Sequence, residues 1–151
     1  MAAVEDKDLG YTAIITQLKA LGGAEISVGV LRNAGKEKDG TDLVDVAVYN
    51  EYGTRHIPPR PFLRIATDEH GGEWQDLAEK CVGKIIDGAL DENRALHLIG
   101  LQAQKDVQAT IKDSSNFKPN APATIARKGS SKPLIDTGTL RARGIRYRVE
   151  E

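Results

Sequence analysis

The sequence predicts a single α+β domain, in which a small, mostly antiparallel sheet packs against two longer amphipathic helices and a short N-terminal helix. Apolar and polar residues alternate in short segments near the start and the end of the chain, as in half-buried strands. Between residues 74 and 112, apolar residues recur at three- and four-residue steps, as in helices. The 151 residues suit one core, and one Trp, two Phe and four Tyr predict that it is mostly aliphatic.

Charge is unevenly distributed along the chain. Residues 1–113 carry 13 Lys and Arg against 19 Asp and Glu, a balance of −6, whereas residues 114–151 carry 8 against 3, a balance of +5. An acidic body with a basic C-terminal segment suits head-to-tail contacts between subunits at least as well as phosphate binding. A thin aliphatic core also favours burial against another copy of the chain.

Cysteine content and hydropathy limit the class of protein. One cysteine, Cys81, excludes an internal disulfide and fits a reducing compartment, and its spacing from Leu77 and Ile85 predicts a buried small hydrophobe. The polar start Met1–Asp8 lacks a signal-peptide pattern, and no apolar run approaches the ~18 residues of a membrane span. We therefore expect a soluble intracellular product.

The N-terminal third predicts one helix and two strands. Tyr11–Leu21 places its apolar residues on one helical face, and Gly22-Gly23 ends that helix. Glu25–Leu31 and Leu43–Tyr49 each alternate β-branched residues with other types, which predicts two half-buried strands. Residues 33–41 are polar and turn-rich, which predicts a mobile hairpin loop that either is solvated or touches a partner.

The chain is organised around Asn50–Arg64, referred to below as the strap, which contains three of the six prolines. Proline fixes φ near −65° and disfavours the α region at the preceding residue, so Ile57–Arg60 within the strap should be extended. The strap is predicted to be either a binding surface or a stiff joint between the sheet and the helices. Its candidate functional residues are Tyr52, Gly53, Arg55, Pro59, Arg60, Pro61, Phe62 and Arg64.

Two long helices are predicted after the strap. Phe62–Thr67 starts as a helix that Gly71-Gly72 should break or kink, and Trp74–Ala89 then carries an apolar stripe. Asp91 is the predicted N-cap of a further helix that continues to Asp113. Because the link between the two helices is short, they should pack antiparallel.

The C-terminal region is predicted to be irregular before it ends in a strand. Residues 114–132 are basic and irregular, and Pro133–Ile135 is a predicted short strand. Gly144–Val149 alternates in polarity, so Arg146 and Arg148 should share the exposed face. The arginines of this region have three interpretations: contact with DNA phosphates, contact with the acidic surface of a neighbouring subunit, or solvation. They are Arg141, Arg143, Arg146 and Arg148.

One enzymatic pattern is present, in which an apolar pair precedes Asp136-Thr137-Gly138, as in the catalytic turn of retroviral-type aspartic proteases. That chemistry needs two aspartates that share a proton, each supported by further strands after the turn. Thirteen residues follow Gly138, which leaves no room for those strands. We therefore predict that Asp136 or Thr137 caps a short helical turn, Thr137–Arg141.

No metal or cofactor site is predicted. His56, His70 and His97 fall in different predicted elements without metal-ligand spacing, and Asp68-Glu69-His70 is interpreted as a solvated helix end. Gly83-Lys84 and Gly129-Ser130-Ser131-Lys132 lack the rest of a phosphate loop, and no Ser or Cys has a His-centred neighbourhood. The sequence therefore predicts a protein that is not an enzyme.

Two segments resemble one family. Val46-Ala-Val-Tyr-Asn-Glu-Tyr-Gly-Thr54, followed by Ile57-Pro-Pro-Arg-Pro-Phe-Leu-Arg64, is similar to the signature of tailed-bacteriophage neck and tail-completion proteins. Pro122-Ala-Thr-Ile-Ala-Arg-Lys128, with Lys132-Pro-Leu-Ile-Asp-Thr-Gly-Thr-Leu140, is similar to the ending of the phage virion-morphogenesis and minor-tail relatives. The chain departs from that ending at Leu140-Arg-Ala-Arg-Gly144, where arginines replace a serine-and-isoleucine stretch.

The resemblance implies a structural virion protein that forms a hexameric or dodecameric ring at the head-tail junction. Its implied partners are other copies of itself, portal-side head connector proteins and tail tube or tail terminator proteins, with non-specific contact to DNA in the channel. The implied location is the virion, and the host cytoplasm during assembly. Two alternatives stay open: a terminator ring that caps the tail tube, and a DNA-contacting assembly factor that uses the C-terminal arginines.

With this resemblance, the strap is interpreted as a stiff joint. Pro59 and Pro61 should set its path, while Tyr52 and Phe62 should anchor it to a core or a subunit boundary. The C-terminal candidates for a joint or interface are Asp136, Thr137, Gly138, Arg146 and Arg148.

Overall fold

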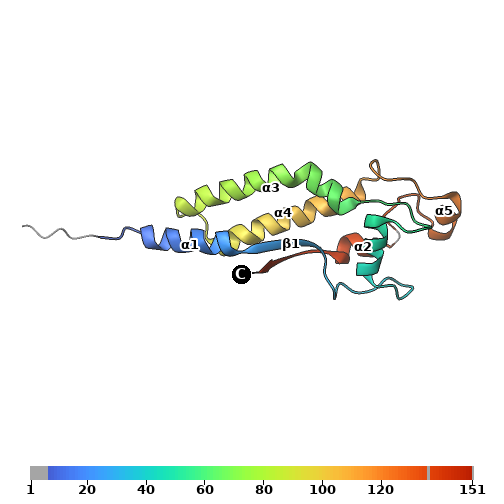
Figure 1. The fold of residues 1–151 in the computed structure, drawn as a ribbon, viewed down its shortest axis with the longest axis horizontal. Helices are drawn as coiled ribbons and strands as arrows, with labels where there is room; N and C mark the ends of the chain where they lie inside the picture. Colours follow the sequence, from blue (N-terminus) through green and yellow to red (C-terminus); the bar gives the residue numbers. More distant parts are fainter. Residues whose placement is uncertain (1–6, 136, 151) are drawn as a thin grey trace, which may run out of the picture.

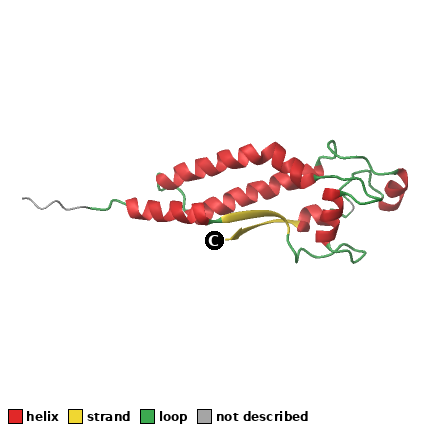
Figure 2. Ribbon diagram, viewed as in Figure 1, coloured by secondary structure: helices red, strands yellow, loops and turns green. Residues whose placement is uncertain are grey.

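The computed structural model describes residues 7–135 and 137–150 and shows an α+β fold, as predicted. Figures 1 and 2 show an elongated molecule in which α4 lies between α3 on one side and a two-stranded sheet on the other. The helices are α1 (Tyr11–Gly23), α2 (Leu43–Tyr52), α3 (Phe62–Ile86), α4 (Glu92–Lys112), α5 (Pro122–Lys128) and the π-helix η1 (Leu140–Gly144). The strands are β1 (Glu25–Val30) and β2 (Ile145–Glu150).

Helices α3 and α4 form the predicted antiparallel pair. The side chain of Asp91 accepts a hydrogen bond from the backbone N–H of Arg94 at 2.8 Å, so the predicted N-cap of α4 is confirmed. Near this end of the pair, Cys81 packs with Ile85 and Ala95 in a buried cluster. Cys81 is only 2% exposed, which confirms its assignment as a small core residue, and this burial raises the pKa of its thiol.

The predicted break at Gly71-Gly72 is wrong, because α3 runs without interruption from Phe62 to Ile86. The kink predicted as the alternative is present, since Figure 1 shows the axis of α3 bending in the part of the helix that contains these glycines. A glycine inside a helix costs only ~1 kcal/mol relative to alanine. The buried side chains of Phe62 and Ala66 before the glycines, and of Cys81 after them, lie on the same helix and outweigh that cost through tertiary packing.

The sheet pairs the beginning of the chain with its end. Strand β1 is antiparallel to β2, with Glu25 opposite Glu150 and Val30 opposite Ile145. Exposure alternates along β2 as predicted, since Ile145 is buried while Arg146 and Arg148 are exposed.

The predicted strand Leu43–Tyr49 is wrong, because these residues begin helix α2. The carboxylate of Asp42 caps this helix by accepting a hydrogen bond from the N–H of Val44 at 2.9 Å. Leu43, Ala47 and Glu51 form its buried face, at the four-residue spacing of a helix rather than the two-residue spacing of a strand. Val44, Val46 and Val48 alternate with other residue types in this segment, and that alternation is why the sequence pattern resembles a strand.

The loop at residues 33–41 is therefore not a hairpin loop, since it joins β1 to α2. A local bridge closes it, with Lys36 paired to Asp42. The N–H of Glu37 donates to the carbonyl oxygen of Thr41 at 2.8 Å within this turn.

The C-terminal region is more regular than predicted. Helix α5 occupies part of the segment 114–132, and Pro133 and Leu134 form a turn instead of a strand. The helical turn predicted at Thr137–Arg141 occurs as η1, a few residues later. Thr137 accepts a hydrogen bond from the N–H of Thr139 at 3.2 Å, whereas Asp136 lies outside the described residues.

The larger core cluster takes its buried residues from α2, α3, α4, η1, β2 and the segment between α4 and η1. It is mostly aliphatic, as predicted, with Phe62 and Phe117 as its aromatic members. Its buried residues are Leu43, Ala47, Phe62, Ala66, Val107, Ile111, Phe117, Leu134, Leu140 and Ile145. Among the described residues, no helix combines the length and the apolar character that a membrane crossing requires.

Gly100→Ala should destabilise the fold by about 1–3 kcal/mol through overpacking. A methyl group there would lie 2.9 Å from Cγ of the Tyr147 ring, which joins α4 to β2. The exposed Gly72→Ala is the control, because a methyl group there meets nothing within 4 Å apart from its own helix backbone. It should stabilise the protein by about 0.5–1 kcal/mol. Urea unfolding followed by circular dichroism measures both changes, and equal effects would contradict this account of the α4–β2 contact.

Candidate functional site

A groove of about 1090 Å³ lies at the end of the molecule that carries α2 and α5. The strap contributes Asn50, Ile57 and Arg60 to its lining. The C-terminal segment contributes Thr137 and Gly138. The two segments that carry the sequence resemblance therefore meet around one hollow, although 57 residues (65–121) separate them in the chain.

A buried carboxylate fixes the strap to the start of α3. Glu51, only 5% exposed, accepts hydrogen bonds from the N–H of Leu63 at 2.9 Å and from the N–H of Arg64 at 3.2 Å. The Arg64 guanidinium donates to the same carboxylate at 3.0 Å and to the carbonyl oxygen of Glu51 at 2.8 Å. A negative charge at a helix N-terminus is favourable, and here it also satisfies amides that have no partner within the helix.

Glu51 was not among the predicted site residues. In the sequence, Glu51 is an acidic residue that lies four residues after Ala47, just as Ala47 lies four residues after Leu43, so it shares their buried helix face. That spacing is visible only once the segment is assigned to a helix. The joint therefore connects α2 to α3, and the predicted connection of a strand to the helices is wrong.

Hydrogen bonds close the strap on itself. The N–H of Thr54 donates to the carbonyl oxygen of Ile57 at 2.8 Å, and the Thr54 hydroxyl accepts from the N–H of His56 at 3.2 Å and of Ile57 at 3.0 Å. The N–H of Arg60 donates to the carbonyl oxygen of Asn50 at 2.6 Å, so both ends of the strap are held together.

Gly53 allows this closure. Its φ of 78° and ψ of 172° lie in a region that essentially only glycine adopts. A side chain there would also be crowded, because a Cβ atom would lie 2.9 Å from the backbone nitrogen of Pro59 and 3.0 Å from the carbonyl oxygen of Ile57. The identity of residue 53 is therefore fixed by conformation and by space.

Arg60 connects the strap to the C-terminal segment. Its guanidinium is buried and donates to the carbonyl oxygen of Lys118 and to the Asn120 side chain, both at 3.0 Å. Asn120 in turn donates to the carbonyl oxygen of Lys132 at 3.2 Å. Burial lowers the pKa of Arg60. This arginine acts as an internal link across the floor of the groove.

The other predicted site residues differ in how deeply they are buried and in whether they line the groove. Phe62 is fully buried and anchors the joint to the core, whereas Tyr52 is 71% exposed and stacks under the Arg64 guanidinium at 5.5 Å. Arg55 and Pro59 are exposed, and Pro61 is half-buried. Arg146 and Arg148 do not line the groove.

Basic residues outnumber acidic ones around the groove. Lys38, Arg60, Lys118, Arg127 and Lys128 line it together with Glu37 and Asp39. The backbone N–H of Thr41 donates to the Asp39 carboxylate and holds its pKa below the ordinary value. With apolar walls from Val46, Ile57 and Leu134, the groove suits a chain segment that carries both apolar and acidic side chains.

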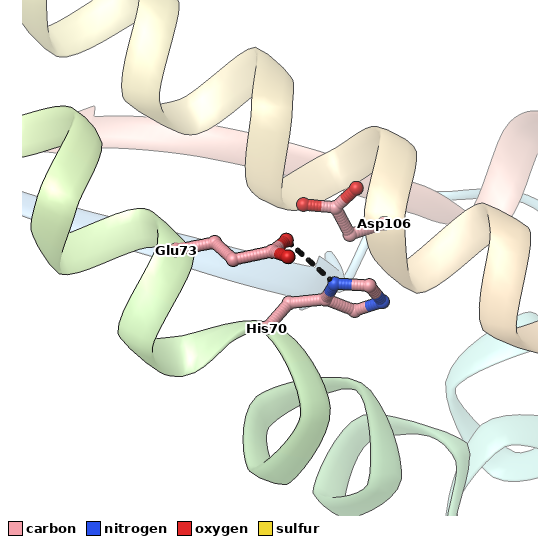
Figure 3. A group of neighbouring side chains, drawn as sticks. All are labelled: His70, Glu73 and Asp106. Carbon is pink, nitrogen blue, oxygen red and sulfur yellow. Dashed lines mark hydrogen bonds and ion pairs between the residues drawn. The ribbon is translucent and has the colours of Figure 1, made fainter.

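A second cluster lies away from the groove, between α3 and α4 (Figure 3). His70, interpreted from sequence as a solvated helix end, lies inside α3 and contacts Glu73, with Asp106 of α4 close by. The hydrogen bond to Glu73 raises the pKa of His70, and the charge of Asp106 adds to that effect. His56 and His97 do not join this cluster.

Comparisons of the chain with protein-family models, curated proteins and solved structures gave no match.

Gly53→Val should destabilise the protein by at least about 1–3 kcal/mol, because its backbone conformation is strained for any other residue. Crowding against Pro59 adds to that cost. Arg55→Ala, an exposed change two residues away, should alter stability by less than about 0.5 kcal/mol. Thermal unfolding measures the stability of each variant, and a parallel assay measures its assembly into particles. If the protein tolerated both substitutions equally well, the strap would not be a stiff joint.

Proposed function

We propose that this chain is a structural virion protein of a tailed bacteriophage that forms a ring at the head-tail junction and joins the portal-connector complex to the tail. The observation that carries the proposal is the groove, around which both segments of family resemblance come together. Neither segment supplies the larger part of the core, so their meeting at one end of the subunit fits a shared surface role.

Exposed apolar side chains beside the groove support a contact between subunits. Val48, Tyr49 and Tyr52 of α2 are 46%, 43% and 71% exposed, and Tyr49 also lines the groove. Tyrosines that present a large apolar area with a polar tip are enriched at protein interfaces. We assign this α2 surface to the contact with a neighbouring copy.

The sheet offers a second means of association. Within the part of the chain that the structure describes, β1 and β2 pair only with each other. The outer edge of β2 is already used inside the chain, since the N–H of Tyr147 donates to the Gln104 side chain at 3.1 Å and the carbonyl oxygen of Ile145 accepts from the Arg146 guanidinium at 3.0 Å. Pairing of the β1 edge with a different surface of the next copy would be a head-to-tail contact, which generates a ring when the rotation closes. The acidic body and basic C-terminal segment favour the same arrangement.

These features suit a neck ring and a terminator ring at the end of the tail tube alike, so the terminator is a variant of the same proposal. The DNA-contacting alternative has weaker support. The Arg146 guanidinium donates to the carbonyl oxygens of Ala142 at 2.9 Å and Ile145 at 3.0 Å, and Arg148 pairs with Glu150. The two backbone bonds leave Arg146 less available to phosphates, whereas the exposed ion pair of Arg148 adds little and leaves its side chain accessible.

Native mass spectrometry and negative-stain microscopy of the purified chain, alone and with the phage portal complex, should show a closed ring. Tyr52→Glu should reduce ring formation at least about tenfold while leaving the thermal midpoint near that of the wild type, because the ring of Tyr52 is exposed. Ile86→Glu, at an exposed apolar position at the other end of α3, is the matched control and should assemble normally. A stable monomer that joins neither head nor tail would refute the proposal.

Binding to duplex DNA should be weak and should not change in Arg146→Glu, since that guanidinium already bonds to its own backbone. Fluorescence anisotropy between about 50 and 200 mM salt measures it, because phosphate contacts give a steep salt dependence. A steep dependence that Arg146→Glu removes would favour the DNA-contacting factor instead.

A further inference from the structure

Three potential metal ligands converge between the two long helices. His70 and Glu73 lie on one face of α3, three residues apart, and Asp106 faces them from α4 (Figure 3). One ligand atom from each residue lies within 4.8 Å of the other two. Ligands 2.0–2.2 Å from a shared ion are about 3–4 Å apart, so small rotamer adjustments would bring this set to coordination distance.

Asp106 is held in place by residues outside the trio. Trp74 donates its indole N–H to one carboxylate oxygen at 2.7 Å, and the Gln102 amide donates to the other at 2.9 Å. Each oxygen keeps a lone pair for a further ligand. Hydrogen bonds of this kind orient the ligands of metal sites and reduce the cost of assembling them.

The cluster is reachable from solvent without being fully exposed. The side chain of His70 is 28% exposed and that of Glu73 is 70% exposed, so an ion can enter from the Glu73 side and retain water in its open positions. Nδ1 of His70 lies 3.0 Å from Oε2 of Glu73. A cation between these two atoms would replace the proton that they share.

We propose that His70, Glu73 and Asp106 form a binding site for one divalent transition-metal ion of the Zn²⁺ class. An imidazole with two carboxylates suits Zn²⁺ and its neighbours, whereas Mg²⁺ prefers an all-oxygen set. The ion connects α3 to α4 next to Gly71 and Gly72, the residues of α3 with the least intrinsic helix propensity in this region. The site is independent of the proposed ring, because none of its three residues lines the groove.

Titration calorimetry of the full, chelator-treated chain with Zn²⁺, and separately with Mg²⁺, tests the site. We expect one Zn²⁺ per chain, no comparable Mg²⁺ binding, and a rise in the thermal midpoint of about 5–10 °C at a hundredfold excess over Kd. Asp106→Asn keeps an acceptor for Trp74 and should weaken Zn²⁺ binding at least about tenfold, as should His70→Gln.

Two matched controls separate this site from other ligands. His97→Gln removes an imidazole of α4 that bonds to Tyr147, and Cys81→Ser removes the buried thiol; both should leave Zn²⁺ affinity unchanged. Circular dichroism confirms that each variant is folded. The proposal is overturned if the wild type binds no Zn²⁺, if Mg²⁺ binds equally well, or if folded His70→Gln and Asp106→Asn variants retain full affinity.

Discussion

The arrangement of the molecule depends on one buried carboxylate. Glu51 leaves the last turn of α2 and caps the first turn of α3, while Arg64 returns from α3 to bond with it. The Arg64 side chain is 59% exposed, so the ion pair itself adds little, and the hydrogen bonds to the two amides supply most of the stabilisation. With both helix ends fixed, the residues between them have one short path, and Gly53 supplies the backbone conformation that this path requires.

Much of the fold could be predicted from the sequence, and the errors share a physical cause. Helix α4 and strand β2 follow a single periodicity with clear ends, so their predictions are confirmed. The sequence of α2 fits both the two-residue spacing of a strand and the four-residue spacing of a helix. Only tertiary contacts decide between the two, because Leu43 and Ala47 are buried against residues distant in the chain. The glycine pair bends α3 without breaking it, since the loss of helix propensity at two glycines is smaller than the stabilisation from packing a long apolar stripe.

The candidate site was predictable in its parts but not in its assembly. The sequence of the strap and that of the 132–140 segment each indicate candidate interface residues, but nothing in either sequence predicts that the two segments line one groove. The link between them is Arg60, whose partners Lys118 and Asn120 carry no local signal. The same limit applies to Asp106, which meets His70 only because α3 and α4 are antiparallel in one particular register.

The distribution of these contacts divides the molecule into two structural regions. The α3–α4 pair with the sheet forms an apolar body whose residues pack at regular spacing. The groove end is built from loops and short helices, and polar groups that are buried and paired, chiefly Glu51 and Arg60, hold it in place. Buried polar groups tolerate displacement poorly, because any shift leaves a donor or acceptor unpaired. A partner that binds in the groove would therefore meet a preformed surface. Any displacement of Glu51 on binding would shift the start of α3, because the Glu51 carboxylate bonds to the first-turn amides of that helix.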